Sequence, residues 1–191
     1  MRLVIMGPPG AGKGTQARLV SDRLGVPAIS TGDIFRANVA AGTELGREAQ
    51  GYMSAGEYVP DMVTNRMVER RLAEADAATG FLLDGYPRTV AQVDVLDSIL
   101  DASGVRLDGV VALVVDHEEV VERLARRDEG RADDTPDVIR HRLRVYEEQT
   151  APLLSSFGDR GLVVEVDGAG SPSDVTRRLL AAVDRPATAC H

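Results

Sequence analysis

Short runs of hydrophobic residues alternate along the chain with longer stretches in which hydrophobic residues recur three or four positions apart. Most of the short runs have no polar interruption, which is typical of strands covered by helices on both faces. We expect five strands, at Leu3–Met6, Ala28–Ser30, Phe81–Leu83, Val110–Val115 and Leu162–Val166. The wider spacing predicts helices at Thr15–Leu24, Pro60–Ala75, Val90–Leu100, Glu118–Arg126 and Pro136–Phe157.

Alternating strands and helices predict an α/β fold with a parallel sheet, in which ligands bind at the carboxyl ends of the strands. Two helix starts support this interpretation, because Thr135 before Pro136 and Ser171 before Asp174 are typical N-terminal caps. Residues 31–59 are polar and interrupted by glycines, and residues 126–135 are almost wholly polar. We expect both segments to lie outside the sheet as appendages.

The composition is that of a globular protein, and it excludes several classes. The 191 residues fit one domain, and with 43% hydrophobic residues wholesale disorder is excluded. Cys190 is the only cysteine, which excludes a disulfide-built fold and a cysteine-ligated zinc site. The 22 Lys and Arg against 30 Asp and Glu leave a net charge of −8, which disfavours a general nucleic-acid binder.

The hydrophobic runs also bear on location. Leu3–Met6 is too short for a signal peptide, and Val110–Val115 is far short of the ~20 residues that cross a bilayer. We therefore expect a cytoplasmic protein without a membrane partner.

A glycine-rich segment directly follows the first predicted strand: Gly7-Pro8-Pro9-Gly10-Ala11-Gly12-Lys13-Gly14-Thr15. It has the G-x-x-x-x-G-K pattern of a phosphate-binding P-loop, placed between a strand and a helix as that motif requires. Glycines let the backbone wrap closely around phosphate, so that N–H groups point at its oxygens, and the helix N-terminus adds a positive dipole end. The alternative, a glycine-rich turn with a solvated lysine, does not account for strand, loop and helix occurring together.

Position 14 departs from the generic P-loop, which has Ser or Thr immediately after the lysine. Here Gly14 follows Lys13, and Thr15 comes next. The magnesium-ligand role of the generic hydroxyl therefore cannot be placed at position 14. Thr15 is the candidate for contact with phosphate or metal.

Several segments resemble the adenylate kinase family. They are Gly-Pro-Pro-Gly-Ala-Gly-Lys-Gly-Thr-Gln at 7–16, Ile-Ser-Thr-Gly-Asp-Ile-Phe-Arg at 29–36, Gly-Phe-Leu-Leu-Asp-Gly-Tyr-Pro-Arg at 80–88, Gln92, and Thr-Ala-Pro-Leu at 150–153. The resemblance covers nearly the whole chain in the right order. It implies the fold of a P-loop nucleoside monophosphate (NMP) kinase, a five-stranded parallel sheet flanked by helices. The implied reaction is ATP + AMP ⇌ 2 ADP with Mg²⁺.

The resemblance also implies how the chain is divided and what it binds. The core would comprise residues 1–29, 60–125 and 137–191, with an NMP-binding lobe at 30–59 and a short lid at 126–136. The lid is too short for the zinc-binding lid of longer members, so no structural zinc is expected. The implied partners are ATP, AMP, ADP and Mg²⁺ with ATP, and the chain is expected to be a monomer.

Residue roles follow from the resemblance. The residues expected to bind ATP are Gly10, Ala11, Gly12, Lys13, Gly14, Thr15, Arg123, Arg127 and Gly170. Those expected to bind AMP are Thr31, Arg36, Glu57, Tyr58, Val59, Gly85, Tyr86, Pro87, Arg88, Gln92, Arg131 and Arg142. Those expected to act in catalysis are Lys13, Arg88, Arg123, Arg131 and Arg142, and Asp84 is expected to act on Mg²⁺ through water.

Within the AMP set, the resemblance places Arg36 and Arg88 on the phosphate and Thr31 and Gln92 near the adenine. A lone arginine is more often a solvated surface charge. Several arginines beside a P-loop favour phosphate binding, because a guanidinium group binds phosphate through two parallel hydrogen bonds. The alternative role of Asp84 is a simple turn or helix cap.

Three other functions compete with this interpretation. A UMP or CMP kinase would share the P-loop and arginines, but pyrimidine-specific relatives tend to carry alanine where this chain has Thr31. A regulatory nucleotide-binding module would be expected to have lost Lys13, Arg88 or the lid arginines, which are all retained. A P-loop nucleic-acid motor is disfavoured by the small size, the acidity and the lack of a basic stripe.

Overall fold

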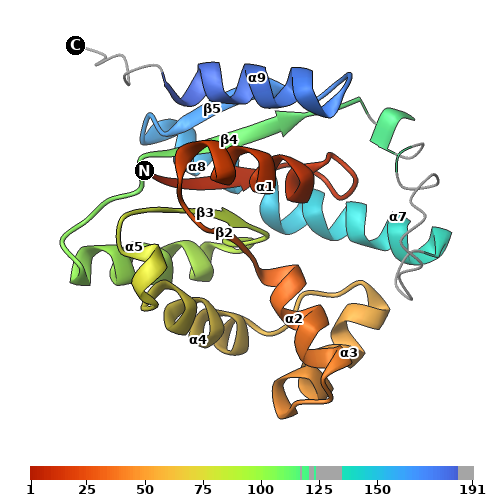
Figure 1. The fold of residues 1–191 in the computed structure, drawn as a ribbon. Coiled ribbons are helices and arrows are strands. Elements are labelled where there is room, and N and C mark those ends of the chain that lie inside the picture. The colour runs from red at the N-terminus through yellow and green to blue at the C-terminus, as the bar shows by residue number, and fades with distance from the viewer. Residues whose placement is uncertain (117, 121–122, 124–134, 185–191) are drawn as a thin grey trace.

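The computed structural model describes residues 1–116, 118–120, 123 and 135–184. Its centre is a parallel sheet of five strands in the order β2-β3-β1-β4-β5 (Figure 1). The strands are β1 (Arg2–Met6), β2 (Ala28–Ser30), β3 (Phe81–Asp84), β4 (Gly109–Val114) and β5 (Val163–Asp167). The α/β fold is thus confirmed, and each strand lies within one residue of its expected bounds.

Helices connect the strands. In the described residues they are α1 (Lys13–Leu24), α2 (Thr31–Ala40), α3 (Glu44–Ala55), α4 (Asp61–Leu72), the short η1 (Ala75–Ala77), α5 (Val90–Ala102), α7 (Pro136–Val145), η2 (Tyr146–Thr150), α8 (Leu153–Asp159) and α9 (Pro172–Val183). The single helix expected at 136–157 is wrong, because a π-helical turn, η2, separates α7 from α8. Thr135 and Ser171 accept hydrogen bonds from backbone N–H groups three residues later, which confirms both predicted caps.

Both faces of the three central strands, β3, β1 and β4, are buried, as the uninterrupted hydrophobic runs predicted, whereas the edge strand β5 is largely exposed. Alternate residues of β1 point to opposite faces: Leu3 and Ile5 pack with residues of α1 and α9, whereas Val4 and Met6 pack with residues of α4, α5 and α8. Figure 1 shows α1 and α9 along one side of the sheet and α4 and α5 along the other. The core therefore consists of two hydrophobic layers that hold β1 rigidly between them.

The helices α2 and α3 pack against each other and extend away from the sheet (Figure 1). They approach so closely that a β-carbon at Gly46 would lie 2.1 Å from the carbonyl oxygen of Asn38. A glycine is therefore required at this crossing. Of the glycines that interrupt residues 31–59, Gly46 thus serves helix packing, whereas Gly42 and Gly56 have positive φ and follow the ends of α2 and α3.

The strand order determines where a ligand can bind. In the sheet, β1 lies between β3 and β4, so the connections after β1 and β3 both begin at the carboxyl edge near the centre. In parallel α/β sheets, ligands bind at this edge where the strand order reverses. No helix of the described residues is long and apolar enough to span a bilayer.

Candidate active site

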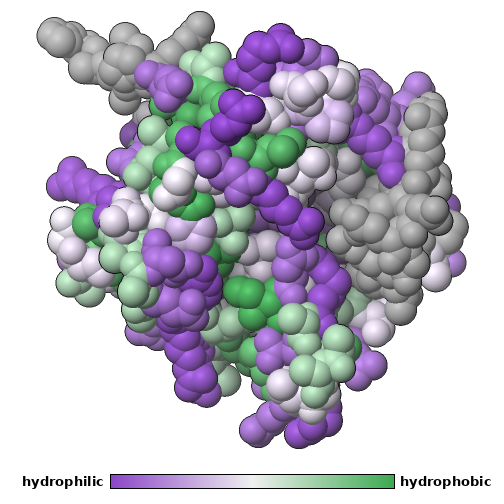
Figure 2. Space-filling model, in the orientation of Figure 1, coloured by the Kyte–Doolittle hydropathy of each residue, from purple (hydrophilic) through white to green (hydrophobic). Residues whose placement is uncertain are grey.

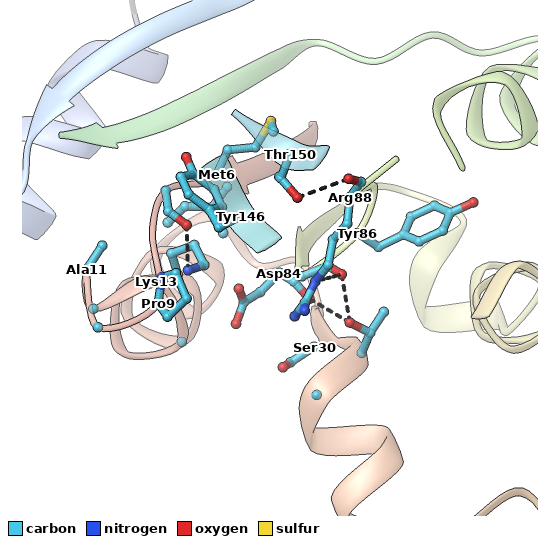
Figure 3. A pocket seen from close by; sticks show the side chains of 18 of the residues that line it. Met6, Pro9, Ala11, Lys13, Ser30, Asp84, Tyr86, Arg88, Tyr146 and Thr150 are labelled. Atoms are coloured by element: carbon cyan, nitrogen blue, oxygen red, sulfur yellow. Dashed lines mark hydrogen bonds between the residues drawn. The ribbon is translucent and has the colours of Figure 1, made fainter. Parts of the chain in front are cut away.

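A cavity of about 550 Å³ opens at the carboxyl edge of the sheet. Figure 3 shows Lys13, Asp84 and Arg88 around it, with the Asp84 carboxylate lying between the other two in this view. These residues come from the start of α1, the end of β3 and the loop before α5. Segments far apart in the sequence are thus brought to one opening.

All the predicted site residues that the structure describes line this cavity. They are Gly10, Ala11, Gly12, Lys13, Gly14, Thr15, Thr31, Arg36, Glu57, Tyr58, Val59, Asp84, Gly85, Tyr86, Pro87, Arg88, Gln92, Arg123, Arg142 and Gly170. Arg127 and Arg131 lie outside the described residues. The individual roles assigned to these residues stay predictions.

The cavity is cationic although the chain is acidic. Among its lining residues are Lys13, Arg18, Arg36, Arg88, Arg123 and Arg142, against the carboxylates of Asp33, Glu57 and Asp84. Six basic groups facing three acidic ones favour an anionic ligand. Figure 2 shows hydrophilic residues predominating on one face of the molecule, with hydrophobic residues in small groups between them.

The glycine-rich segment forms a tight loop at the entrance of α1. The ammonium of Lys13 donates hydrogen bonds to the carbonyl oxygens of Gly7, at 2.8 Å, and Pro8, at 2.9 Å. Lys13 is the only lysine of the chain. Its side chain is therefore folded over the loop, with the positive charge held at the N-terminal end of α1, where anions bind.

Arg123 links the glycine-rich loop to the segment that follows β5. Its guanidinium donates to the carbonyl oxygens of Ala11 at 3.3 Å and Gly168 at 2.8 Å, and it pairs with Glu119 at 2.5 Å. One arginine thus joins the loop after β1 to the loop after β5. Gly168 was not among the expected site residues, since no local pattern marks a backbone carbonyl as a partner of a distant arginine.

Arg36 is held by an acidic neighbour. It forms an ion pair with Asp33 one turn earlier on α2, and Arg18 reaches the same carboxylate at 3.2 Å. Burial by itself would raise the pKa of Asp33, but the hydrogen bonds and charges of Arg36 and Arg18 outweigh burial and hold that pKa below its usual value. Asp33 therefore stays ionised and orients two cations toward the cavity.

Arg88 is fixed by the loop that follows β3. Its Nε donates to the carbonyl oxygen of Gly85 at 2.8 Å, and Thr31 donates to the same oxygen at 2.9 Å. Gly85 has φ +79°, and a β-carbon there would lie 2.7 Å from Thr31 Oγ1 and 2.8 Å from Arg88 Nη2. Only glycine fits between these two groups without displacing them. The peptide bond between Tyr86 and Pro87 is cis.

The buried amide of Gln92 organises the same loop. Its Oε1 accepts from the backbone N–H of Arg88 at 2.7 Å, and its Nε2 donates to Asp61 at 2.6 Å. Asp61 also accepts from Thr89 at 2.9 Å. Gln92 is 1% exposed, so its position is determined by these contacts as well as by any contact with adenine. Asp61 was missed, because its partners lie about thirty residues away in sequence.

Tyr86 lies beneath this loop as a neutral hydrogen-bond donor. The single proton of its hydroxyl is shared between two acceptors, Asn65 Oδ1 at 2.8 Å and the carbonyl oxygen of Gln92 at 3.1 Å. Burial, and then the nearby charge of Asp61, raise the pKa of Tyr86 far above its usual value. The phenol therefore keeps its proton and both hydrogen bonds at any pH at which the protein folds.

Asp84 can serve a magnesium ion that arrives with a nucleotide. Its side chain is buried at the end of β3, and a β-carbon at Gly14 would lie 3.5 Å from its Oδ2. A carboxylate thus stands beside the position where a generic P-loop carries its hydroxyl. No group of three or more metal-ligating side chains occurs in the described part of the chain. One carboxylate fits Mg²⁺, which keeps several waters and takes further ligands from substrate phosphates.

The segment after α3 lies against α7. A β-carbon at Gly56 would lie 3.0 Å from side-chain carbons of Val138 and Arg142. Next to it, Glu57 Oε1 lies 2.5 Å from His141 Nε2. Glu57 and Arg142 are thus placed together at the mouth of the cavity, on two elements far apart in sequence.

Comparisons with known proteins agree over almost the whole chain. The sequence model of the adenylate kinase family matches residues 5–162. A curated adenylate kinase of Kocuria rhizophila is 63% identical over 186 residues, which cover 96% of this chain and 99% of the relative. Adenylate kinases of Nocardioides sp., 62% identical over 96% of this chain and 97% of the relative, and Nocardia farcinica, 60% identical over 97% and 100%, are also similar.

A P-loop on a parallel sheet, sharing one cationic cavity with a second group of arginines, defines a phosphotransferase of the nucleoside monophosphate kinase class. The chain belongs to the adenylate kinase family. Its activity is the activity of that family, and the resemblance found in the sequence motifs is confirmed.

Proposed function

We propose that this chain transfers the terminal phosphoryl group of ATP directly to AMP and so forms two molecules of ADP, reversibly. The bond from the γ-phosphorus to the ADP oxygen breaks while a bond to an AMP phosphate oxygen forms. The observation that carries the proposal is one cavity lined both by the P-loop and by Arg36 and Arg88. Phosphoryl transfer requires alignment and charge neutralisation rather than covalent help from the protein, and this cavity supplies both.

ATP would lie on the P-loop side. Backbone N–H groups of residues 10–15 and the ammonium of Lys13 would bind its phosphates, and Lys13 would exchange its bonds to Gly7 and Pro8 for phosphate oxygens. Arg123 would flank the nucleotide from the side of Gly170. Support comes from the hydrogen bond that already links Arg123 to Ala11 within the loop.

AMP would lie on the opposite side, against the start of α2 and the loop before α5. Arg36 and Arg88 would bind its phosphate, since both guanidinium groups line the cavity and are held in place by neighbours. Thr31 and Gln92 would lie near the adenine. Glu57 and Tyr58, which precede Val59 in the same contact segment, would contribute backbone groups. The buried positions of Thr31 and Gln92 support a shaped base pocket.

When Mg²⁺ is bound with ATP, it would neutralise phosphate charge and orient the transferring group. Asp84 is the residue that would hold it, through water. Its carboxylate lies beside Gly14, next to where the phosphates would bind.

Residues 30–59 would form the AMP-binding lobe and residues 126–136 the lid, which would close to exclude water. The projection of α2 and α3 away from the sheet supports a separate lobe (Figure 1). Arg127 would flank ATP with Arg123, and Arg131 and Arg142 would bind the phosphates around the transferring group, from the lid and from the helix after it. We also propose that the protein acts as a cytoplasmic monomer, consistent with exposed large hydrophobic residues that are dispersed over different elements.

Parallel assays test this function. Phosphate transfer from Mg-ATP to AMP, UMP and CMP is measured by separating the products. We expect ADP formation that requires AMP and falls by at least about a hundredfold with either pyrimidine, because a base pocket built for adenine leaves its polar groups unpaired with UMP or CMP. Comparable rates with UMP or CMP would contradict the adenine role of Thr31 and Gln92. ATP binding without transfer would contradict catalysis itself.

A further inference from the structure

Arg88 is contacted at both ends: by Tyr58, which so far has only an expected contact with AMP, and by Thr150, to which no role has been assigned. The carbon of its guanidinium group lies 4.7 Å from the centre of the Tyr58 ring. At the other end, its backbone carbonyl oxygen accepts a hydrogen bond from Thr150 at 3.0 Å (Figure 3). Tyr58 follows α3, and Thr150 ends the π-helical turn η2, so the two contacts come from separate parts of the chain.

Tyr58 and Thr150 are themselves joined, which closes the set of contacts into a ring. The Tyr58 hydroxyl and Thr150 Oγ1 are 2.8 Å apart. A threonine hydroxyl has a single proton, and Thr150 directs it to Arg88, so Tyr58 must be the donor to Thr150. The ring therefore runs from the Arg88 guanidinium to the Tyr58 face, through the Tyr58 hydroxyl to Thr150, and back to the Arg88 backbone.

The π-helical turn gives Thr150 its position. The backbone N–H of Ala151 donates to the carbonyl oxygen of Tyr146, five residues earlier, at 2.9 Å. This inserted residue interrupts the regular helix, and such turns are frequent at functional sites. Thr150 is 5% exposed and has both hydrogen bonds inside the protein. The ring of Tyr146 is partly buried, and this burial together with Tyr58 raises the pKa of Tyr146 to about 12.

We propose that Tyr58 and Thr150 are positioning residues that align the Arg88 guanidinium for the phosphate of the nucleoside monophosphate. The inference rests on the proposed role of Arg88. The Tyr58 ring covers the face of the guanidinium group, and the carbonyl oxygen of Gly85 accepts a hydrogen bond from its Nε–H. These two contacts orient the Nη groups of Arg88 without a carboxylate that would compete with phosphate for them. A cation over an aromatic face is held without losing its charge, which suits an arginine that must bind phosphate.

The same contacts make the alignment of Arg88 depend on two other elements. Tyr58 belongs to the segment that ends the proposed AMP-binding lobe, and Thr150 belongs to the segment after α7. Arg88 is fully aligned only when both lie against the loop before α5. If the lobe moved away, the aromatic ring of Tyr58 would leave the guanidinium group of Arg88, and Arg88 would bind the phosphate more weakly.

The test measures AMP binding by calorimetry and KM for AMP and for ATP in separate titrations. We expect Tyr58→Leu to raise Kd and KM for AMP about tenfold, with KM for ATP within twofold, because only the monophosphate side loses its aligned arginine. Tyr58→Phe keeps the aromatic ring but loses the hydroxyl, and it should raise Kd and KM for AMP about threefold. The control is Tyr52→Leu, because Tyr52 is an exposed tyrosine of α3. It should leave Kd for AMP and both KM values unchanged.

Two double variants separate positioning from a direct contact with the nucleotide. In the Arg88→Ala background, Tyr58→Leu should change Kd for AMP by less than twofold, since there is no guanidinium left to align. Thr150→Val removes both of its hydrogen bonds, so adding Tyr58→Phe to it should have no further effect. Undiminished effects of Tyr58→Leu in the Arg88→Ala background, or additive effects of the second pair, would overturn the proposal.

Failure of this inference can be distinguished from failure of the proposed function. If Arg88→Ala itself binds AMP as tightly as the unmodified chain, the assigned role of Arg88 is wrong. If Arg88→Ala loses AMP binding while Tyr58→Leu and Thr150→Val bind normally, only the positioning role is wrong.

Discussion

The two sides of the cavity are built in different ways. The P-loop side is local: one run of nine residues, from the end of β1 into the first turn of α1, supplies backbone N–H groups and Lys13. The other side is assembled from the start of α2, the segment after α3, the loop before α5 and the turn η2, joined by side-chain hydrogen bonds. One side depends on the backbone of a single turn, and the other depends on tertiary contacts among four segments.

The difference predicts different responses to mutation. Within the P-loop itself, Lys13 is the only charged side chain, so its loss is severe and confined to the chemistry. On the other side, each side chain holds its neighbours, so substitutions have smaller and graded effects on AMP binding and also on stability. The following predictions test this contrast from the largest expected effect to the smallest.

Lys13→Ala should lower kcat by about a thousandfold, because a preorganised charge on the transferring phosphates is lost. The free energy of unfolding should change by less than about 0.5 kcal/mol, since the ammonium is half-buried and its hydrogen bonds to Gly7 and Pro8 lie within its own loop. Steady-state kinetics and urea denaturation measure the two effects. Arg23→Ala, exposed near the end of the same helix, is the control and should retain full activity. A Lys13→Ala variant with normal kcat would remove the distinction between the two sides.

Gly85→Ala should raise KM for AMP about tenfold and leave KM for ATP unchanged, because the added β-carbon displaces Thr31 and Arg88. It should also lower the free energy of unfolding by about 2 kcal/mol. Gly104→Ala is a matched control: its φ is +66°, and nothing lies within 4 Å of the added carbon. The control should lose stability through backbone strain alone, with both KM values unchanged. A similar KM for AMP in both variants would show that the contacts of Gly85 do not matter.

Asp33→Asn should destabilise the protein slightly, by about 0.5 kcal/mol at neutral pH, because the half-exposed ion pairs with Arg36 and Arg18 are screened by solvent. The pKa of Asp33 is lower in the folded protein than its unfolded value of 3.8, so the stabilisation is present above that value. It is lost as the pH falls through the lower folded pKa. Urea denaturation at a series of pH values should show the two proteins converging in acid. If the two free energies of unfolding still differed at the lowest pH, Asp33 would act by packing rather than by charge.

The contrast also explains what the sequence could predict. The five strands and the P-loop follow from local patterns, because an uninterrupted hydrophobic run and a glycine-rich turn carry their own signals. The π-helical turn at Tyr146–Thr150 was missed, since one inserted residue hardly changes a helical period. The AMP side was assigned by resemblance alone. The contacts of Asp61, Gly168 and Thr150 depend on tertiary placement, and no spacing rule within one segment reveals them.

The solitary lysine has a consequence for chemical modification. Every other basic side chain of this protein is an arginine, so an amine-selective acylating reagent has one side-chain target, Lys13, besides the terminal amine. That amine is half-buried and hydrogen-bonded within the phosphate-binding loop. Covalent labelling of lysine is therefore equivalent to labelling the catalytic centre, and the extent of labelling, with and without nucleotide, reports directly on whether that centre is occupied.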